Sequence, residues 1–96
     1  MAAKQLFHRK VVLADSTIVE MVIWQLPERS GERPRGLKYR LYAGTANGTC
    51  LVRYDNERGK GDHKHIGDRE QPYAFVDVER LIADFLADLA QQRSAR

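Results

Sequence analysis

Two histidines separated by one residue are the side chains of this sequence best suited to chemistry. His63 and His65 lie in the polar run GKGDHKH, which has no apolar residue. An imidazole titrates near neutral pH, so one ring can accept a proton while a second ring donates one. If the segment is extended, both rings project to the same side of the chain. Such a pair could supply the general base and the general acid of metal-independent RNA cleavage.

Charged and aromatic neighbours extend this hypothesis. Lys60, or Arg58 close to it, would stabilise the additional negative charge that develops on phosphorus, and Asp62 would orient a histidine. Arg58 and Lys64 are candidate ligands for the substrate's phosphates. Tyr73 could stack on an unpaired base, because an aromatic face binds single-stranded nucleic acid with little sequence demand.

Two other interpretations of these residues stay open. In the first, His63, His65 and a carboxylate such as Asp62 or Asp55 bind a metal ion. In the second, the residues are structural: Asp62 accepts backbone hydrogen bonds in a turn, and the histidines are exposed or packed beside Tyr73. The leading hypothesis needs no metal and no other cofactor.

Hydrophobic patterns predict the elements that must position this segment. Residues 5–13 and 17–26 are rich in β-branched and apolar residues, which is typical of strands. Asp77 is placed to cap a helix over about residues 77–91, whose apolar residues recur at helical spacing. With a further hairpin, the sequence predicts an α+β fold in which a four-stranded antiparallel meander carries a C-terminal helix packed on one face.

The hairpin is predicted by the Asn-Gly dipeptide at residues 47–48, which favours a two-residue type I′ turn. That turn sets Arg40 opposite Asp55 and Lys38 opposite Glu57. The two acidic residues are then either cross-strand partners of basic residues or additional acidic residues of the site, and both interpretations stay open. The polar segment that follows, residues 55–72 in all, is predicted to be the functional loop.

Length, composition and charge limit the class of protein. The 96 residues indicate a single domain over residues 1–96, and 43% hydrophobic with 30% charged residues is ordinary for a folded globular chain. Sixteen Lys and Arg against thirteen Asp and Glu give a net charge of +3, which allows an anionic partner such as RNA. The single cysteine, Cys50, excludes an internal disulfide and a cysteine metal cluster.

Neither end of the chain nor its interior indicates a membrane protein. No apolar run approaches the roughly 18 residues that a membrane span needs. The N-terminal residues also lack the apolar core of a signal peptide. We therefore expect a cytoplasmic protein without a membrane partner.

The second predicted strand has more apolar residues than one helix can cover. In an extended strand, the side chains of Val19, Met21 and Ile23 point to one face, whereas those of Trp24 and Leu26 point to the other. An apolar sheet face without a covering element is typical of an interaction surface. We therefore expect association with a partner protein or with a second copy of the chain.

Four segments carry a resemblance to a known family. They are MVIW at residues 21–24, LKYRL at 37–41, VRYDNERGKGDHKH at 52–65 and GDREQPYAF at 67–75, the last followed by the terminal helix. Together they resemble the TumE family of bacterial and archaeal toxin-antitoxin toxins, over most of the chain. The resemblance implies a small cytoplasmic toxin of a type II system, bound and held inactive by a helix-turn-helix antitoxin. The residues of this sequence that match the family's motif are Lys60, Asp62, His63 and His65, and the resemblance assigns no role to them.

Three functions follow from these observations. The leading hypothesis is an RNA-cleaving toxin, an endoribonuclease that uses the His/Lys/Asp loop for general acid and base catalysis. The alternatives are a noncatalytic protein that binds through its basic loop and open sheet face, and a metal-dependent nuclease that uses the same loop.

Overall fold

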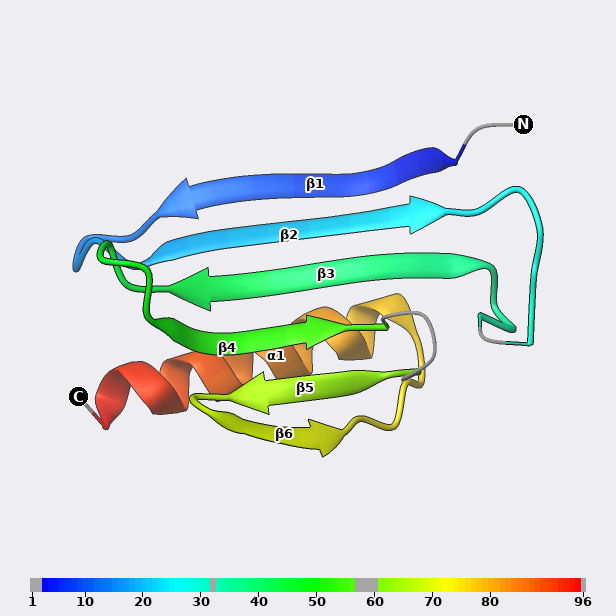
Figure 1. Cartoon of the computed structure of the whole chain (residues 1–96). Coiled ribbons are helices and arrows are strands. Elements are labelled where there is room, and N and C mark those ends of the chain that lie inside the picture. The colour runs from blue at the N-terminus through cyan, green and yellow to red at the C-terminus, as the bar shows by residue number, and fades with distance from the viewer. Residues whose placement is uncertain (1–2, 32, 57–60, 96) are drawn as a thin grey trace.

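The chain forms one antiparallel sheet and one helix in a computed structural model that describes residues 3–31, 33–56 and 61–95 (Figure 1). The strands lie side by side in chain order: β1 Lys4–Val12, β2 Ile18–Gln25, β3 Leu37–Gly44, β4 Cys50–Asp55, β5 His63–Ile66 and β6 Arg69–Pro72, followed by α1 Val78–Ser94. The predicted α+β class, antiparallel sheet and C-terminal helix are confirmed. The predicted number of strands is wrong, because the described residues form six strands instead of four.

The two unpredicted strands, β5 and β6, come from the segment that we expected to be a loop. Their sequences, HKHI and REQP, are short and mostly polar, so they show no apolar alternation. Pro72 ends β6, which is an edge strand and therefore tolerates a residue without a backbone N–H. Gly67-Asp68 joins the strands, with Gly67 at φ 62°. A two-residue Gly-Asp connection is itself a hairpin signal, so the sequence did contain evidence for this pair.

From the Ala43–Val52 pair onward the register of β3 and β4 is as predicted, although the turn between the strands is not. Arg40 faces Asp55, as the predicted register requires. The Gly48 N–H donates to the Thr45 carbonyl (3.0 Å), and the Thr45 N–H donates to the Thr49 carbonyl (2.9 Å). Gly48 has a φ of 93°. The connection is therefore a three-residue loop that ends in a left-handed glycine, and the predicted two-residue turn is wrong.

A bulge in β4 restores the register that the longer loop would shift. Gly44 faces Cys50, whereas Ala43 faces Val52, so Leu51 is one additional residue on this strand. Leu51 and Val52 are both buried in the core despite being neighbours in sequence. The predicted pairing of Lys38 with Glu57 lies outside the described residues.

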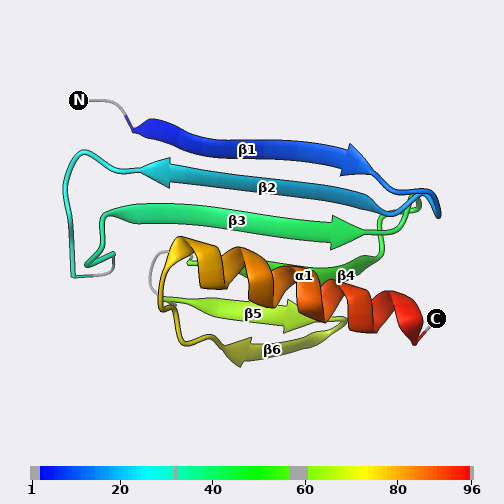
Figure 2. The same ribbon diagram turned by 180° about the vertical axis from the view of Figure 1, so that it is seen from behind.

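The helix covers one face of the sheet, over β4 and its neighbours (Figures 1 and 2). As predicted, Asp77 caps it: its side chain accepts a hydrogen bond from the Arg80 backbone N–H (2.7 Å). The buried helix residues are Leu81, Phe85 and Leu89. Burial of one such side chain contributes roughly 1.5–3 kcal/mol, so this stripe is sufficient to attach the helix to the sheet.

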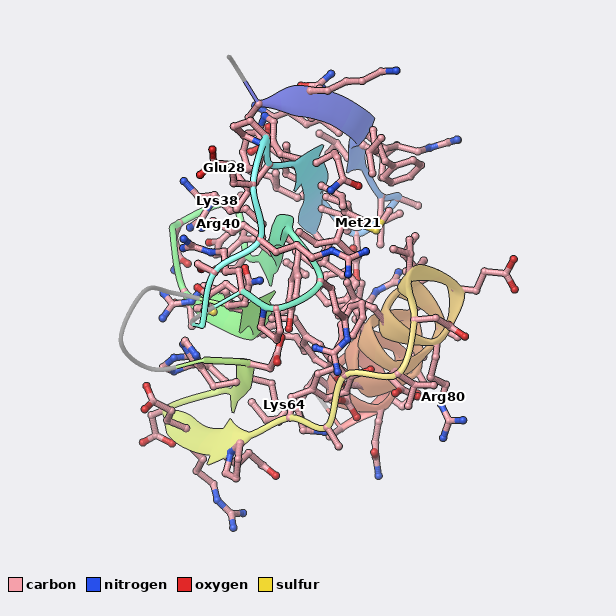
Figure 3. All side chains as sticks on the ribbon, turned by 90° about the vertical axis from the view of Figure 1, so that its right-hand side faces the viewer. Met21, Glu28, Lys38, Arg40, Lys64 and Arg80 are labelled. Atoms are coloured by element: carbon pink, nitrogen blue, oxygen red, sulfur yellow. The ribbon has the colours of Figure 1, made fainter. Side chains whose placement is uncertain are left out.

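The opposite face of the sheet carries no helix among the described residues. Figure 3 views the molecule from one end: Met21 lies on the side of the helix, and Lys38 and Arg40 project from the other side. We call the latter the helix-free face, because antiparallel neighbours place Lys38, Arg40, Arg53, His63 and His65 on it. Of the two apolar sets that we expected one helix not to cover together, Val19, Met21 and Ile23 are buried within the chain itself, whereas Trp24 and Leu26 are only partly buried.

Candidate active site

The pairing of the last three strands gathers the titratable residues in one row across the helix-free face. In the β4–β5 pair, Asp55 faces His63 and Arg53 faces His65, and in the β5–β6 pair His65 faces Glu70. Directly opposed residues of an antiparallel pair share a face, with their Cβ atoms about 5 Å apart. The two imidazole rings have their centroids 5.4 Å apart in an edge-to-face arrangement.

The Nε2 atom of His65 contacts one hydrogen-bond acceptor and one hydrogen-bond donor. Glu70 Oε2 lies 3.0 Å from it and Arg53 Nη2 lies 2.9 Å from it. A carboxylate only accepts hydrogen bonds and a guanidinium only donates them. The protonated nitrogen therefore donates to Glu70, whereas the deprotonated nitrogen accepts from Arg53. His65 Nε2 thus has a hydrogen-bond partner in each of its two proton states.

His63 instead faces two acceptors. Its Nδ1 lies 3.0 Å from the Gly61 carbonyl oxygen and its Nε2 lies 2.6 Å from Asp55 Oδ1. Apart from this ion contact, neither Nε2 nor Oδ1 has an aligned hydrogen-bond partner among the described residues. Only the doubly protonated ring offers a proton to both acceptors. The side chain is 5% exposed, and Asp55 and the Gly61 carbonyl are placed to accept both protons of a doubly protonated ring.

Arg53 connects the two histidines. Its Nε lies 3.4 Å from Asp55 Oδ2 while its Nη2 contacts His65, and one third of the side chain is exposed. A guanidinium in this position can bind a phosphate in addition to its protein partners. Sequence reasoning missed Arg53 and Glu70 as site residues. The parity of Arg53 with Asp55 could have identified the first, and the Gly-Asp hairpin signal could have identified the second.

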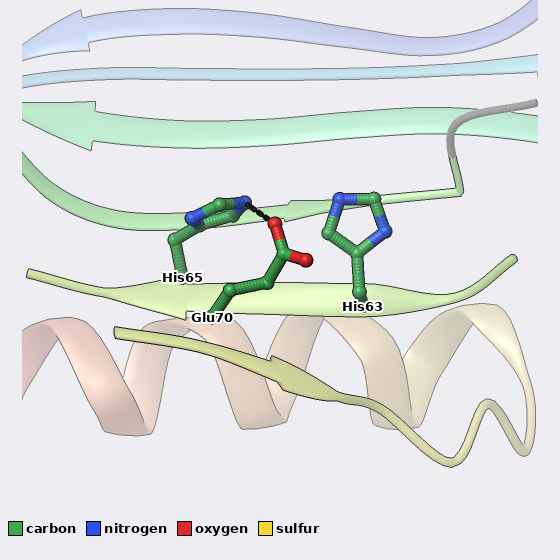
Figure 4. Close-up of side chains that lie close together, drawn as sticks. All are labelled: His63, His65 and Glu70. Carbon is green, nitrogen blue, oxygen red and sulfur yellow. Dashed lines mark ion pairs between the residues drawn. The ribbon is translucent and has the colours of Figure 1, made fainter. Parts of the chain in front are cut away.

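A surface hollow of about 250 Å³ adjoins this row at the outer strands. The residues that line it are Asp62, His63, Glu70, Gln71 and Pro72. Figure 4 shows the Glu70 carboxylate between the two imidazole rings, which come from successive same-face positions of β5. A group bound in the hollow would therefore meet His63 and Glu70 together.

The same residues could hold a metal ion. One ligand atom each of His63, His65 and Glu70 lies within 4.8 Å of the others. Two imidazoles and one carboxylate are ligands that Zn²⁺ accepts. Arg53 already contacts the His65 nitrogen, so a metal ion that used this atom would have to displace the guanidinium.

Asp62 lies elsewhere than we expected for a residue that orients a histidine. Its Oδ1 accepts a hydrogen bond from the Tyr39 hydroxyl (2.6 Å), and its Oδ2 lies 3.9 Å from Arg35 Nη1. The carboxylate that contacts His63 belongs to Asp55, for which the sequence left open a cross-strand pairing with Arg40 and a place in the site. The burial of Tyr39 and this hydrogen bond raise the pKa of its phenol far above the ordinary value.

Lys64 and Tyr73, predicted to contact substrate, lie between the sheet and the helix. The Lys64 ammonium is 3.1 Å from Asp88, and the Tyr73 hydroxyl donates to Asp84 (2.7 Å). Tyr54 also donates to Asp88. Burial, followed by the hydrogen bond to the carboxylate, raises the pKa of Tyr54 and Tyr73, and the hydrogen bond from Tyr73 lowers the pKa of Asp84. These contacts attach the helix to the sheet.

Three predicted residues cannot be placed. Glu57, Arg58 and Lys60 lie outside the described residues. Of the other predicted residues, His63, His65 and Asp55 come together on the helix-free face, whereas Lys64 and Tyr73 contact helix residues.

Comparison with known proteins places the chain in a family. The family model described as Toxin TumE matches residues 3–93, which include every strand and nearly all of the helix. Neither the curated proteins nor the solved structures contain a match to the chain. Among the described residues, no helix has the length and apolar character that crossing a membrane requires. The chain belongs to the TumE family of toxins, and a toxin of this kind implies an antitoxin as its partner.

Proposed function

We propose that the chain is the toxin of a type II toxin-antitoxin system and that it cleaves RNA without a metal ion. His65 acts as general base, His63 acts as general acid, and Arg53 binds the phosphate that reacts. The observation that carries the proposal is the pair of opposite partners at His65 Nε2, on the same face as a second imidazole that faces two acceptors.

The reaction follows from these proton states. Neutral His65 accepts the proton of a ribose 2′-hydroxyl, and the 2′-oxygen forms a bond to phosphorus. The bond from phosphorus to the 5′-oxygen breaks, and that leaving oxygen takes the proton on Nδ1 of protonated His63 in place of the Gly61 carbonyl, because Nε2 is buried against Asp55. The products are a 2′,3′-cyclic phosphate and a 5′-hydroxyl. Glu70 then stabilises protonated His65, and Arg53 stabilises the charge on phosphorus, together with Lys60, which we assign on sequence alone.

Glutamine variants of the three histidines test this proposal. Purified protein is incubated with RNA, and the product ends are identified. The His65→Gln and His63→Gln variants should each cleave roughly 10²- to 10⁴-fold more slowly, which is the usual contribution of a general acid or base. His8→Gln is the matched control, because His8 also pairs with a carboxylate, at 3.1 Å from Glu20. It should cleave at the rate of the unmodified protein.

Expression in cells gives the second part of the test. Growth arrest should accompany cleavage and be lost in both site variants. If both variants still arrest growth, the acid and base proposal is wrong, and the noncatalytic alternative, a protein that acts by binding through its basic surface, becomes the better explanation.

A metal-dependent nuclease is a second candidate function, because three ligand atoms lie within 4.8 Å of one another. Cleavage would then disappear with a chelator and return with added Zn²⁺ or Mn²⁺. The metal-free mechanism instead predicts that a chelator leaves the rate unchanged. An excess of Zn²⁺ should slow the metal-free reaction, because the ion would occupy the two catalytic imidazoles.

We further propose that the antitoxin is a helix-turn-helix protein encoded beside the toxin and that the toxin acts in the cytoplasm. The implied antitoxin partner supports this assignment. Co-expression of the neighbouring reading frame should restore growth and yield a complex that co-purifies.

A further inference from the structure

Two aromatic rings on the helix-free face are each accompanied by a cation. Trp24 on β2 faces Lys38 on β3, and the Lys38 ammonium lies 5.5 Å from the centre of the indole ring. Two residues further along β3, the Arg40 guanidinium lies 5.4 Å from the centre of the Tyr42 ring. An aromatic face next to a fixed positive charge is a surface that suits a base and its phosphate.

Within the described part of the chain, both cations are open to a ligand. Lys38 and Arg40 are exposed, and neither forms an ion pair with another described residue. The described acidic residues that face Tyr42 and Arg40 across the strand pairs have other partners: Glu20 contacts His8 at 3.1 Å, and Asp55 contacts His63 at 2.6 Å. The charge that this part of the face presents is therefore positive. Figure 3 shows both side chains projecting away from the sheet on the side opposite the helix.

This aromatic and basic surface is continuous with the candidate active site. Tyr42 faces Arg53 across the β3–β4 pair, and Arg53 faces His65 across the β4–β5 pair. Neighbouring strands are about 4.8 Å apart and a strand rises about 3.4 Å per residue, so Trp24 on β2 and His65 on β5, three strands across and four residues along, are separated by roughly 20 Å. A few nucleotides of a single strand can cover that distance.

We infer that single-stranded RNA lies across the helix-free face from Trp24 to Arg53, with Trp24 and Tyr42 as stacking surfaces and Lys38 and Arg40 as phosphate ligands. The inference rests on the proposed function and names its substrate class and binding surface. A single strand presents the base faces that the two rings require, whereas a duplex keeps its bases stacked on each other. The positive charge of the surface favours a polyanion over a second copy of this basic chain.

The single tryptophan of the chain makes a direct test feasible. The probe is a 2′-O-methyl RNA of about ten nucleotides, a length typical of single-strand binding sites. It cannot be cleaved by this route because its 2′-oxygen has no proton. Titration should quench the Trp24 fluorescence to saturation. The logarithm of the binding constant should fall linearly with the logarithm of the salt concentration, and a hairpin duplex should bind roughly tenfold more weakly.

Two arginine variants on opposite faces provide the matched comparison. Arg40→Gln should weaken binding several-fold at 0.1 M salt and reduce the salt slope by about 0.7, the value for one phosphate contact to a single strand. Arg9→Gln removes the same charge from β1. Because Arg9 faces Met21 on the side of the helix, this variant should bind as the unmodified protein does. Trp24→Ala, measured with a labelled probe, should lose roughly 10- to 100-fold in affinity.

Several outcomes would overturn the inference: absence of saturable quenching, equal affinity for the duplex, or equal effects of Arg40→Gln and Arg9→Gln on binding. A fluorescence change with protein concentration alone would also overturn it, because it would assign the face to a second copy of the chain.

Failure of the proposed function would give different results. If unmodified protein binds the probe as described but cleaves no RNA, the surface stands and the catalytic proposal is wrong. If His65→Gln abolishes cleavage while Arg40→Gln binds normally, the catalytic proposal stands and the proposed binding surface is wrong.

Discussion

His65 and His63 differ in what surrounds them, although they have the same side chain and lie two residues apart. His65 Nε2 contacts a donor and an acceptor, so it can change its proton state without losing a partner. His63 contacts two acceptors and is nearly buried, so its environment suits one charged state. This difference, and not the HxH spacing, is the reason for assigning the base to His65 and the acid to His63.

Asp55 is the residue on which this assignment depends most. In Asp55→Asn the neutral amide replaces the carboxylate 2.6 Å from His63 Nε2, so the protonated ring that the proposed mechanism needs would lose its counter-ion. We expect kcat for RNA cleavage to fall roughly 10²-fold, while affinity for the uncleavable 2′-O-methyl probe changes little. Single-turnover cleavage and probe titration measure the two quantities.

Glu79→Gln is the control, because Glu79 is an exposed acidic residue in the first turn of α1 and its removal changes the net charge equally. An Asp55→Asn protein with the kcat of the control would show that the contact between Asp55 and His63 has only a structural role.

At the scale of elements, the β3–β4 hairpin positions Arg53 and Asp55 by combining a loop with a bulge. The three-residue loop shifts the pairing by one residue, and Leu51 shifts it back before Val52. A one-residue slip reverses which face every side chain occupies. Without the bulge, the site residues of β4 would point into the core.

Gly44, which precedes this loop, tests how tightly the hairpin is packed. A Cβ atom at Gly44 would lie 2.9 Å from the Thr49 carbonyl oxygen and would also overlap the Tyr42 ring. Because a backbone atom cannot move independently, Gly44→Ala should reduce the free energy of unfolding by about 1–3 kcal/mol, the usual cost of overpacking. Urea denaturation measures the change.

Gly31→Ala is the matched control, since a Cβ atom there meets nothing within 4 Å. Its free energy of unfolding should stay within about 0.5 kcal/mol of the unmodified value. Equal stability of the two variants would show that the hairpin adjusts more easily than its packing suggests.

At the scale of the whole molecule, three tyrosine hydroxyls anchor separate parts of the chain to carboxylates. Tyr39 donates to Asp62, Tyr54 to Asp88 and Tyr73 to Asp84, in the last two cases from the sheet side to the helix. Burial is the main cause that raises the pKa of all three phenols, and the adjacent carboxylate adds to it. Their proton state therefore contributes to the stability of the fold as a whole.

These raised pKa values predict loss of stability at alkaline pH. In the unfolded chain a tyrosine ionises near pH 10, whereas in the folded chain the three phenols stay protonated above that pH. The stability that they contribute is complete below about pH 10 and is lost as the pH rises towards the folded pKa. Each phenol should lower the free energy of unfolding by about 1.4 kcal/mol per pH unit in that range.

Urea denaturation between pH 8 and pH 11 measures this slope. Tyr73→Phe removes one of the three phenols. Above pH 10 the free energy of unfolding of this variant should therefore fall less steeply with pH, by about 1.4 kcal/mol per pH unit. An unchanged slope would contradict the raised pKa of Tyr73.

The sequence by itself determined the elements that have a strong local signal. Alternating and β-branched residues predicted β1 to β4, and the Asp77 cap predicted the helix. The Asn-Gly turn predicted that Arg40 faces Asp55, and this pairing holds although the turn is longer than predicted, because the bulge at Leu51 restores the register. Local pattern is sufficient there because each element buries its own apolar residues. The histidines were recognisable as chemical groups for a similar reason, since a polar run of glycines and titratable residues contributes nothing to a core.

Only the tertiary structure decided which residues surround those histidines. HKHI and REQP have too few apolar residues to predict strands by alternation, and they pair because β4 and then β5 present unpaired backbone groups along their edges. That pairing brings Arg53, Asp55 and Glu70 to the imidazoles and leaves Asp62 with Tyr39. Residues far apart in sequence become neighbours through hydrogen bonds of the backbone, which is common to all residues, so their side chains carry little advance sign of the contact.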